Sequence, residues 1–187
     1  MSKARKHAVL GLSIAAASVA VARPAGAYVF KHYQNHAVCL GVKAGLMTHG
    51  TPIVTWDCNG HADQNWNLQP YWGSYYQLWT SGSAAPPHRN AQCIALRNDG
   101  STQVLNGAII WECSASTTDQ GWELVYVLND SSNHPCYYFK NKKAYDQTGT
   151  TMVLTVDSYP QAGVASPVYL YWWAAWGTWA QQLWCAY

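Results

Sequence analysis

The chain has 187 residues, of which 11% are charged and 49% hydrophobic, and its formal net charge is +2. Lys3, Arg5, Lys6 and Arg23 precede residue 28, so the rest of the chain carries 7 Lys and Arg against 9 Asp and Glu. This balance argues against a protein that binds nucleic acid through a strongly basic surface. The only basic cluster, Lys140 to Lys143, is typical of a solvated hairpin edge that resists strand addition.

Residues 1–27 have the features of a secretory signal peptide. A basic start is followed by an apolar run from Ala8 to about Ala22, and the small residues Ala25-Gly26-Ala27 precede the predicted cleavage point. A membrane anchor is the alternative, but the run is shorter than the roughly 20 residues that a spanning helix needs. We therefore expect a secreted, extracellular protein without a membrane span. Residues 28–187 have the size of one domain, and we expect no separate catalytic domain beside it.

The first of three similar units begins at Cys39-Leu40-Gly41-Val42. A second apolar segment, Ile53–Cys58, follows, and Gln64-Asn65-Trp66 closes the unit. These segments are short and rich in β-branched and aromatic residues, and Asn59-Gly60 separates two of them. Such punctuation is typical of strands joined by turns.

The same order recurs twice more along the chain. The second unit contains Cys93-Ile94-Ala95-Leu96, Ala108–Cys113 and Gln120-Gly121-Trp122. The third is degenerate and contains Val153-Leu154-Thr155-Val156, Val168–Trp173 and Gln182-Leu183-Trp184. In every unit 17 or 18 residues separate the first landmark from an aromatic residue, which is Trp56, Trp111 or Tyr171. This spacing predicts one supersecondary unit per copy, and the absence of a long helical period after the leader predicts an all-β fold.

Together these landmarks resemble the ricin B-type lectin family. The pattern of that family is a Cys-Leu-Asp-Val-like strand, a strand that ends in Gln-x-Trp-x-Cys, and a closing Gln-x-Trp. The resemblance covers about residues 28–187 and implies a β-trefoil, in which three pseudo-repeats surround a three-fold axis. It also implies carbohydrate binding without catalysis or cofactor.

The cysteines repeat with the units. An even number in an exported chain favours disulfides, and the matched positions predict Cys39–Cys58 and Cys93–Cys113. Cys136 and Cys185, near the start and end of the third unit, are then expected to form the third bond. Zinc binding is the competing interpretation, but the sequence has no Cys-x-x-Cys pair and no regular His spacing, so we expect no metal site.

The resemblance implies a shallow sugar site in each unit, where an aromatic face stacks on a pyranose and polar side chains bind its hydroxyls. The aromatic residue maps to Trp56, Trp111 and Tyr171, the polar residue before the closing motif to Asp63, Asp119 and Gln181, and the motif amide to Gln64, Gln120 and Gln182. Packing is the alternative role for the three aromatic residues. For the motif amides the alternative is a structural bond from a turn to the backbone.

The chain departs from the family pattern at two positions in every unit. The family Asp that holds the sugar hydroxyls maps to Gly41, Ala95 and Thr155, and the family Gln maps to Val54, Ile109 and Tyr169. Losing a charged hydrogen-bond acceptor removes roughly 1.5–3 kcal/mol of interaction. We hypothesise that Asp63 and Asp119 replace the missing carboxylates.

Two functions follow from these observations. The expected function is non-catalytic binding of a polysaccharide or glycoconjugate, and no hydrolase, zinc-protease or phosphate-loop motif is present in the sequence. The alternative is an interaction or inhibitor scaffold that has lost sugar binding. Such a scaffold would contact a protein through the Trp-rich third repeat, Tyr169–Trp179.

Overall fold

The computed structural model describes residues 26–83, 91–156, 159–174 and 179–187. The predicted leader lies outside these residues except for Gly26 and Ala27. Within the described ranges no helix has the length and apolar character needed to cross a membrane. The described residues form twelve strands, all in antiparallel pairs.

Six of the strands form a closed ring. They are β1 (Tyr28–His32), β4 (Asn65–Pro70), β5 (Tyr76–Thr80), β8 (Trp122–Asn129), β9 (Pro135–Asn141) and β12 (Trp184–Ala186). Each pairs with the next in that order, and β12 pairs back with β1. Closure leaves these strands with no free edge, which removes the usual site of edge-to-edge aggregation.

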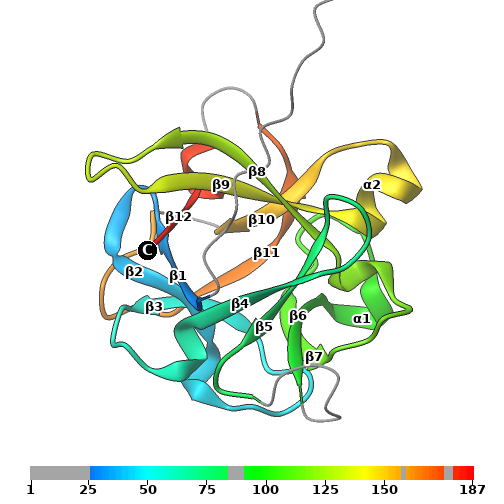
Figure 1. Ribbon diagram of the computed structural model, residues 1–187, viewed down its shortest axis with the longest axis horizontal. Helices are drawn as coiled ribbons and strands as arrows, with labels where there is room; N and C mark the ends of the chain where they lie inside the picture. Colours follow the sequence, from blue (N-terminus) through cyan, green and yellow to red (C-terminus); the bar gives the residue numbers. More distant parts are fainter. Residues whose placement is uncertain (1–25, 84–90, 157–158, 175–178) are drawn as a thin grey trace, which may run out of the picture.

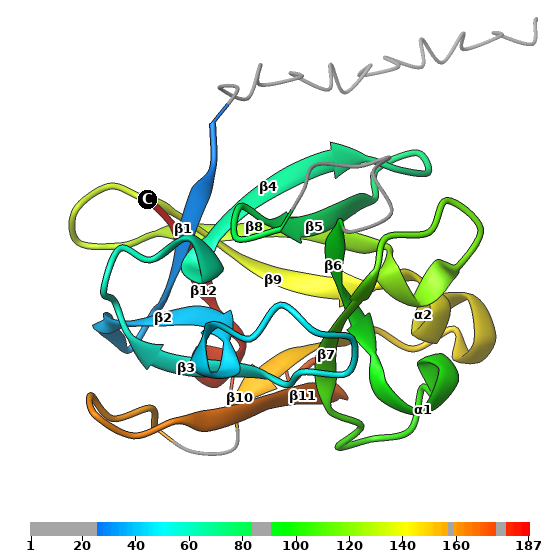
Figure 2. The ribbon, with the colours of Figure 1, turned by 90° about the horizontal axis from the view of Figure 1, so that it is seen from below.

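The other six strands form three hairpins, one in each repeat. They are β2 (Asn35–Val42) with β3 (Ile53–Asp57), β6 (Gln92–Leu96) with β7 (Ala108–Glu112), and β10 (Met152–Val156) with β11 (Ser166–Trp172). The hairpins have separate positions in the ribbon (Figure 1), and a second view places them on one side of β4, β5 and β8 (Figure 2). Their registers match, because Cys39, Cys93 and Val153 pair with Trp56, Trp111 and Tyr171 respectively. The predicted all-β, β-trefoil fold of three pseudo-repeats is confirmed.

The tryptophans of the three Gln-x-Trp motifs lie in the core. Trp66, Trp122 and Trp184 have no exposed surface and pack with Phe30 and Phe139. Each indole Nε1 donates to a carbonyl on the hairpin of its own repeat, at Leu40 (2.9 Å), Ile94 (2.9 Å) and Leu154 (3.3 Å). Because a buried indole N–H needs a partner, each bond fixes one hairpin to the barrel. The three motif tryptophans therefore have a packing role.

Short helices connect the strands. Four are 3₁₀ turns, namely η1 (Lys43–Gly45), η2 (Ala62–Gln64), η3 (Thr118–Gln120) and η4 (Trp179–Gln182), and two are α-helices, α1 (Arg97–Gly100) and α2 (Lys142–Thr148). Helix α2 corrects the interpretation of the basic cluster as a hairpin edge. The Asn141 side chain accepts a hydrogen bond from the Ala144 amide at its start, and Gly149 ends it with φ of 68°. Only Lys140 lies on a strand, and its ammonium pairs with Glu123 at 3.3 Å.

All three predicted disulfides are present. Cys39–Cys58 and Cys93–Cys113 brace the first two hairpins, where each cysteine pair has a sequence separation of 19 or 20. Cys136–Cys185 joins the neighbouring barrel strands β9 and β12, across a separation of 49. The third repeat therefore has its covalent link in the barrel and none in its hairpin.

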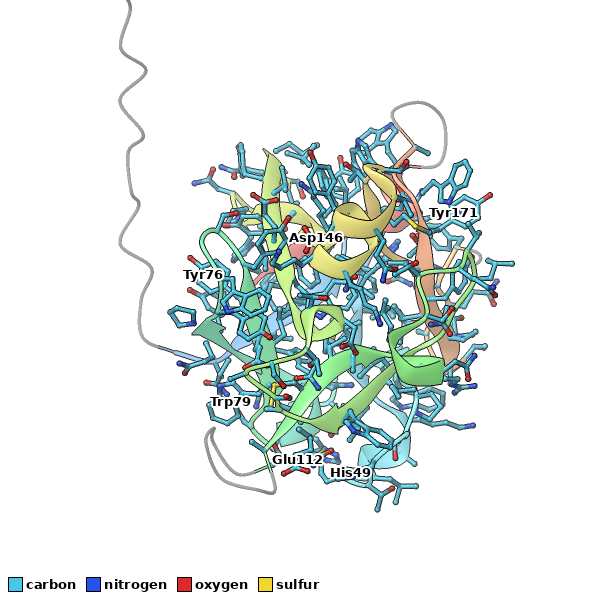
Figure 3. All side chains as sticks on the ribbon, turned by 90° about the vertical axis from the view of Figure 1, so that its right-hand side faces the viewer. His49, Tyr76, Trp79, Glu112, Asp146 and Tyr171 are labelled. Carbon is cyan, nitrogen blue, oxygen red and sulfur yellow. A yellow bond between two sulfur atoms is a disulfide. The ribbon has the colours of Figure 1, made fainter. Side chains whose placement is uncertain are left out.

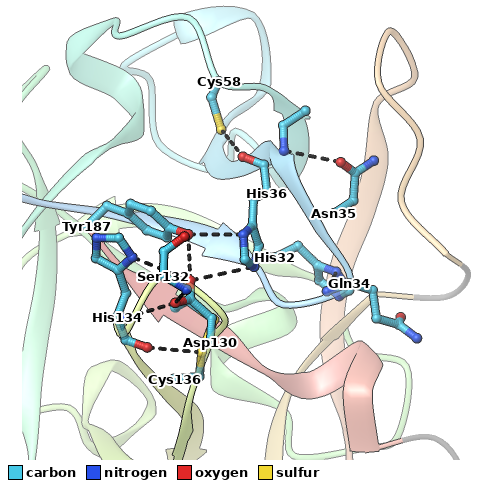
Figure 4. A network of polar contacts seen from close by, with 12 residues as sticks. His32, Gln34, Asn35, His36, Cys58, Asp130, Ser132, His134, Cys136 and Tyr187 are labelled. Atoms are coloured by element: carbon cyan, nitrogen blue, oxygen red, sulfur yellow. Dashed lines mark hydrogen bonds and ion pairs between the residues drawn. A yellow bond between two sulfur atoms is a disulfide. The ribbon is translucent and has the colours of Figure 1, made fainter.

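A buried carboxylate organises the turn between β8 and β9 (Figure 4). Asp130 accepts hydrogen bonds from the Tyr187 hydroxyl (2.5 Å) and from the amides of Ser132 and His134 (both 2.8 Å). Nitrogen atoms of His134 and His36 lie 3.5 and 3.7 Å from its Oδ2. Burial alone would raise the pKa of Asp130, but these hydrogen bonds lower it to about 2. The network ties the turn to β2 and to the residue that follows β12.

Candidate functional site

The outward face of the first hairpin carries a cleft of about 440 Å³, the first cleft, bordered by Gly41, Lys43, Val54, Trp56, His61 and Asp63 among others. Alternate residues of a strand share a face, so Gly41 and Val54, which pair across the hairpin, form its floor. The indole of Trp56 stands at one end and is 39% exposed. Its exposed ring is therefore accessible to a ligand, while its backbone stays paired in β3.

Asp63 provides the polar wall of the first cleft. A Cβ atom at residue 41 would lie 3.4 Å from Oδ2 of Asp63. The Asp63 carboxylate thus lies close to the place where the side chain of an Asp at residue 41, as in the family pattern, would start. Among the described residues no hydrogen bond or ion pair engages this carboxylate, so its oxygens remain available to accept hydrogen bonds from hydroxyl groups.

The second hairpin repeats the arrangement on a larger scale. A cleft of about 720 Å³, the second cleft, is bordered by Ala95, Arg97, Ile109, Trp111, Glu112 and Asp119 among others. Trp111 is 47% exposed, and the His49 ring lies 4.9 Å from it. Figure 3 shows His49 and Glu112 near the lower edge of the molecule and Tyr171 of the third repeat at the upper right.

The three motif amides form identical clamps inside the fold. The Nε2 atoms of Gln64, Gln120 and Gln182 donate to the carbonyls of Asp57, Glu112 and Trp172, and their Oε1 atoms accept from the amides of Asn59, Ser114 and Ala174. At most 2% of each residue is exposed. The predicted bond from a turn to the backbone is confirmed. Direct contact with a sugar stays a prediction.

The third repeat lacks the polar wall. Tyr171 is 39% exposed, but Gln181 replaces the acidic residue, and the Thr155 hydroxyl already accepts a hydrogen bond from Gln182 Nε2 at 3.1 Å. Tyr169, which pairs with Thr155, replaces the smaller Val54 and Ile109 on the floor and meets Tyr171 edge to face. Residues 175–178 of the predicted Trp-rich segment lie outside the described residues. Of the three predicted sites, the structure thus assembles an aromatic residue and a carboxylate in two.

The exposed aromatic residues Trp56, Trp111 and Tyr171 form three aromatic shelves. Each shelf is bordered by a segment from the preceding repeat. The amides of Gly50 and Leu105 donate to the carbonyls of Ile110 and Leu170, one residue before each shelf. In the same way β11 of the third repeat pairs with β3, and Ala165 borders the first cleft. Sequence reasoning missed His49 for this reason, because it belongs to the first repeat but borders the shelf of the second.

A further cavity of about 450 Å³ lies at one end of the barrel and has different chemistry. Its walls include Tyr28, Phe30, Leu68, Leu124 and Tyr137, and they are largely apolar. Since it offers few polar groups for sugar hydroxyls, the two hairpin clefts are the better candidates for the functional site.

The similarity to known proteins is one of fold. No protein-family model and no curated protein sequence matches this chain. Solved structures do match. The designed three-fold symmetric protein ThreeFoil has a TM-score of 0.67 at 18% identity, over 86% of this chain and 97% of its own. The fold is that of the ricin B-like lectins.

Two lectin structures support that statement. The Rhizoctonia solani agglutinin has a TM-score of 0.63 at 17% identity, over 89% of this chain and 96% of its own. The Macrolepiota procera ricin B-like lectin, solved in complex with lactose, has a TM-score of 0.59 at 12% identity, over 89% and 97%. Identities this low establish the shared fold, and the chemistry of each site has to be argued from this chain's own residues.

Proposed function

We propose that this protein is a secreted, non-catalytic carbohydrate-binding protein whose working sites are the first and second clefts. The observation that carries the proposal is the same pair in both clefts, an exposed indole (Trp56 or Trp111) together with a carboxylate (Asp63 or Asp119). The leader sequence and the three disulfides support export.

The chemistry of each cleft suits a sugar. The indole face covers the apolar face of a pyranose, and the carboxylate accepts hydrogen bonds from neighbouring hydroxyls. The amide clamps of Gln64 and Gln120 hold the cleft walls, so little ordering is left for the binding step. Single shallow sites bind weakly, and two sites on one rigid body raise the affinity for a repeating polysaccharide.

A glycan array tests this proposal, using the exported, oxidised protein and a Trp56→Ala/Trp111→Ala double variant. We expect the double variant to lose on the order of tenfold or more in affinity, because it removes both stacking faces. Tyr126→Ala is the matched control, since Tyr126 is 57% exposed on β8 and borders neither cleft. Glycan binding that the double variant retains in full would contradict the proposal.

The carboxylates are tested separately with Asp63→Asn and Asp119→Asn. Asn keeps the size of the side chain but removes its charge, so we expect each variant to weaken its own cleft while the fold is unchanged. Because either cleft alone can still hold a polysaccharide, Asp63→Asn/Asp119→Asn should lose more affinity for a polysaccharide than the product of the two single-variant fold-changes.

A second candidate function rests on the third repeat. Val104, Leu105, Tyr171 and Trp172 are 38%, 60%, 39% and 56% exposed, and the backbone bond from Leu105 to Leu170 brings the two segments together. Exposed apolar side chains of this kind favour a protein-binding surface. A protein partner that is lost in Leu105→Ser/Trp172→Ala, but is unaffected by sugars and by Trp56→Ala/Trp111→Ala, would favour the scaffold over the lectin.

A further inference from the structure

The first and second clefts each carry a cation at the same place. Lys43 and Arg97 stand two residues beyond Gly41 and Ala95, and their amides donate to the carbonyls of Pro52 (3.0 Å) and Gly107 (2.9 Å). Both residues border their clefts. The two positions are therefore equivalent by backbone pairing, and both carry a positive side chain.

The guanidinium of Arg97 lies in line with the floor of the second cleft. A Cβ atom at Gly107 would lie 3.7 Å from Cζ of Arg97, which places the guanidinium over the start of the outward face of β7. Gly107, Ile109 and Trp111 alternate along one strand and share that face. The second cleft therefore presents a cation, an apolar floor and an indole in a row.

The charges of these two cations are unpaired within the described part of the chain. Among the described residues Lys43 and Arg97 make no ion pair, whereas Lys140 and Lys142 pair with Glu123 (3.3 Å) and Asp146 (2.6 Å). An unpaired guanidinium beside a ligand cleft is suited to bidentate binding of a carboxylate or sulfate. Gly41 and Ala95 replace the family carboxylate, and the negative charges that remain in the clefts are those of Asp63 in the first and of Glu112 and Asp119 in the second.

The spacing of these groups sets the length of the ligand. Four residues separate position 107 from Trp111, and a strand rises about 3.3 Å per residue, so the two ends lie roughly 13 Å apart along the backbone. This span exceeds one pyranose ring. A ligand that uses both ends must contain more than one sugar, with its anionic group on a different residue from the stacked ring.

We propose that both clefts select acidic glycans. One sugar ring stacks on Trp56 or Trp111, its hydroxyls bind Asp63 or Asp119, and an anionic group on a neighbouring sugar binds Lys43 or Arg97. This inference rests on the proposed function and narrows its ligand class from carbohydrate in general to chains that bear carboxylate or sulfate groups.

Matched pairs of glycans test the inference. Oligogalacturonides are compared with their methyl esters, and sulfated galactan oligosaccharides with their desulfated forms, on the wild type and on Lys43→Gln/Arg97→Gln. We expect the wild type to bind the acidic member of at least one pair about tenfold more tightly, with affinity that falls as salt rises. The double variant should lose this preference. The pair that shows the preference identifies carboxylate or sulfate as the recognised group.

Controls separate this inference from the proposed function. Lys142→Gln removes a cation outside both clefts and should keep the preference. Equal binding of acidic and neutral members by the wild type, or a preference that survives in Lys43→Gln/Arg97→Gln, would overturn acidic selection and leave carbohydrate binding standing. The same holds if only neutral glycans on the array bind. If no glycan distinguishes the wild type from Trp56→Ala/Trp111→Ala, the proposed function itself fails.

Discussion

Trp122 Nε1 donates a hydrogen bond to the carbonyl of Ile94 at 2.9 Å, and both residues are fully buried. The bond connects barrel strand β8 to the centre of the second hairpin. It recurs in the other two repeats with Leu40 and Leu154 as acceptors. The position of each hairpin, and with it the position of each cleft, depends on a fully buried tryptophan.

We expect Trp122→Phe to destabilise the protein by about 2 kcal/mol or more. The substitution leaves the Ile94 carbonyl without its partner and opens a void in the core. Urea unfolding measures the change. Trp111→Phe is the control, because Trp111 is 47% exposed and its substitution should stay within about 0.5 kcal/mol. Equal losses of unfolding free energy in the two variants would contradict the assignment of Trp122 to the core and of Trp111 to the surface.

Acid should destabilise the fold through His32. Burial lowers the pKa of His32 to about 4, and the ring meets Trp184 edge to face. The unfolded chain takes up the proton near pH 6.5 and the folded protein does not. Stability therefore falls as pH drops from about 6.5 to 4, by about 3 kcal/mol in total.

His32→Phe should flatten this part of the stability profile, because it removes the group that titrates. The readout is the slope of unfolding free energy against pH, so a uniform loss of stability leaves the test intact. His61→Ala, an exposed position, should keep the wild-type slope. A variant profile that runs parallel to the wild type between pH 6.5 and 4 would rule His32 out as the cause.

Asp130 should also make stability fall with pH, but at lower pH, because the fold favours its charged form. Its pKa is lowered from 3.8 to about 2, so the carboxylate stabilises the fold fully above about pH 4, and that contribution is lost as pH falls toward 2. We expect Asp130→Asn to be less stable than the wild type by about 2 kcal/mol at pH 6. The difference should shrink below pH 4. A constant difference across that range would indicate a packing effect in place of a charge effect.

The three disulfides should contribute unequally. In the chain-entropy model, a separation of 49 between Cys136 and Cys185 corresponds to about 4 kcal/mol, and a separation of 19 between Cys39 and Cys58 to about 3 kcal/mol. Cys136→Ala/Cys185→Ala should therefore unfold at lower urea than Cys39→Ala/Cys58→Ala. The reverse order would show that local packing around the cysteines outweighs the loop closed by each bond.

The repeats explain why so much of the fold is predictable. Three copies of a landmark order with constant spacing identify equivalent strands, and equivalent cysteines such as Cys39 and Cys93 then identify their own partners. Helix α2 was not predicted, because its start depends on the Asn141 side chain and its end on Gly149, and neither belongs to the repeated pattern. The helical conformation of that segment therefore depends on local capping.

The site was predictable in part. The shelf residues Trp56 and Trp111 and the carboxylates Asp63 and Asp119 border two clefts, as their positions in the repeat suggested. The motif amides are buried because they bind backbone groups up to ten residues away. The three-residue motif does not show those partners. Lys43 and Arg97 could have been found by extending the alignment two residues past Gly41 and Ala95.

The loops that cross between repeats have a consequence for how this molecule can be divided or rearranged. His49 of the first repeat borders the shelf of the second, Leu105 of the second repeat bonds beside Tyr171, and Ala165 of the third borders the cleft of the first. Each cleft or shelf is thus built from most of one sequence repeat and a short segment of the repeat before it. A chimera that exchanges one whole repeat would create two hybrid clefts, and a crossover that transfers the second cleft intact has to lie before His49.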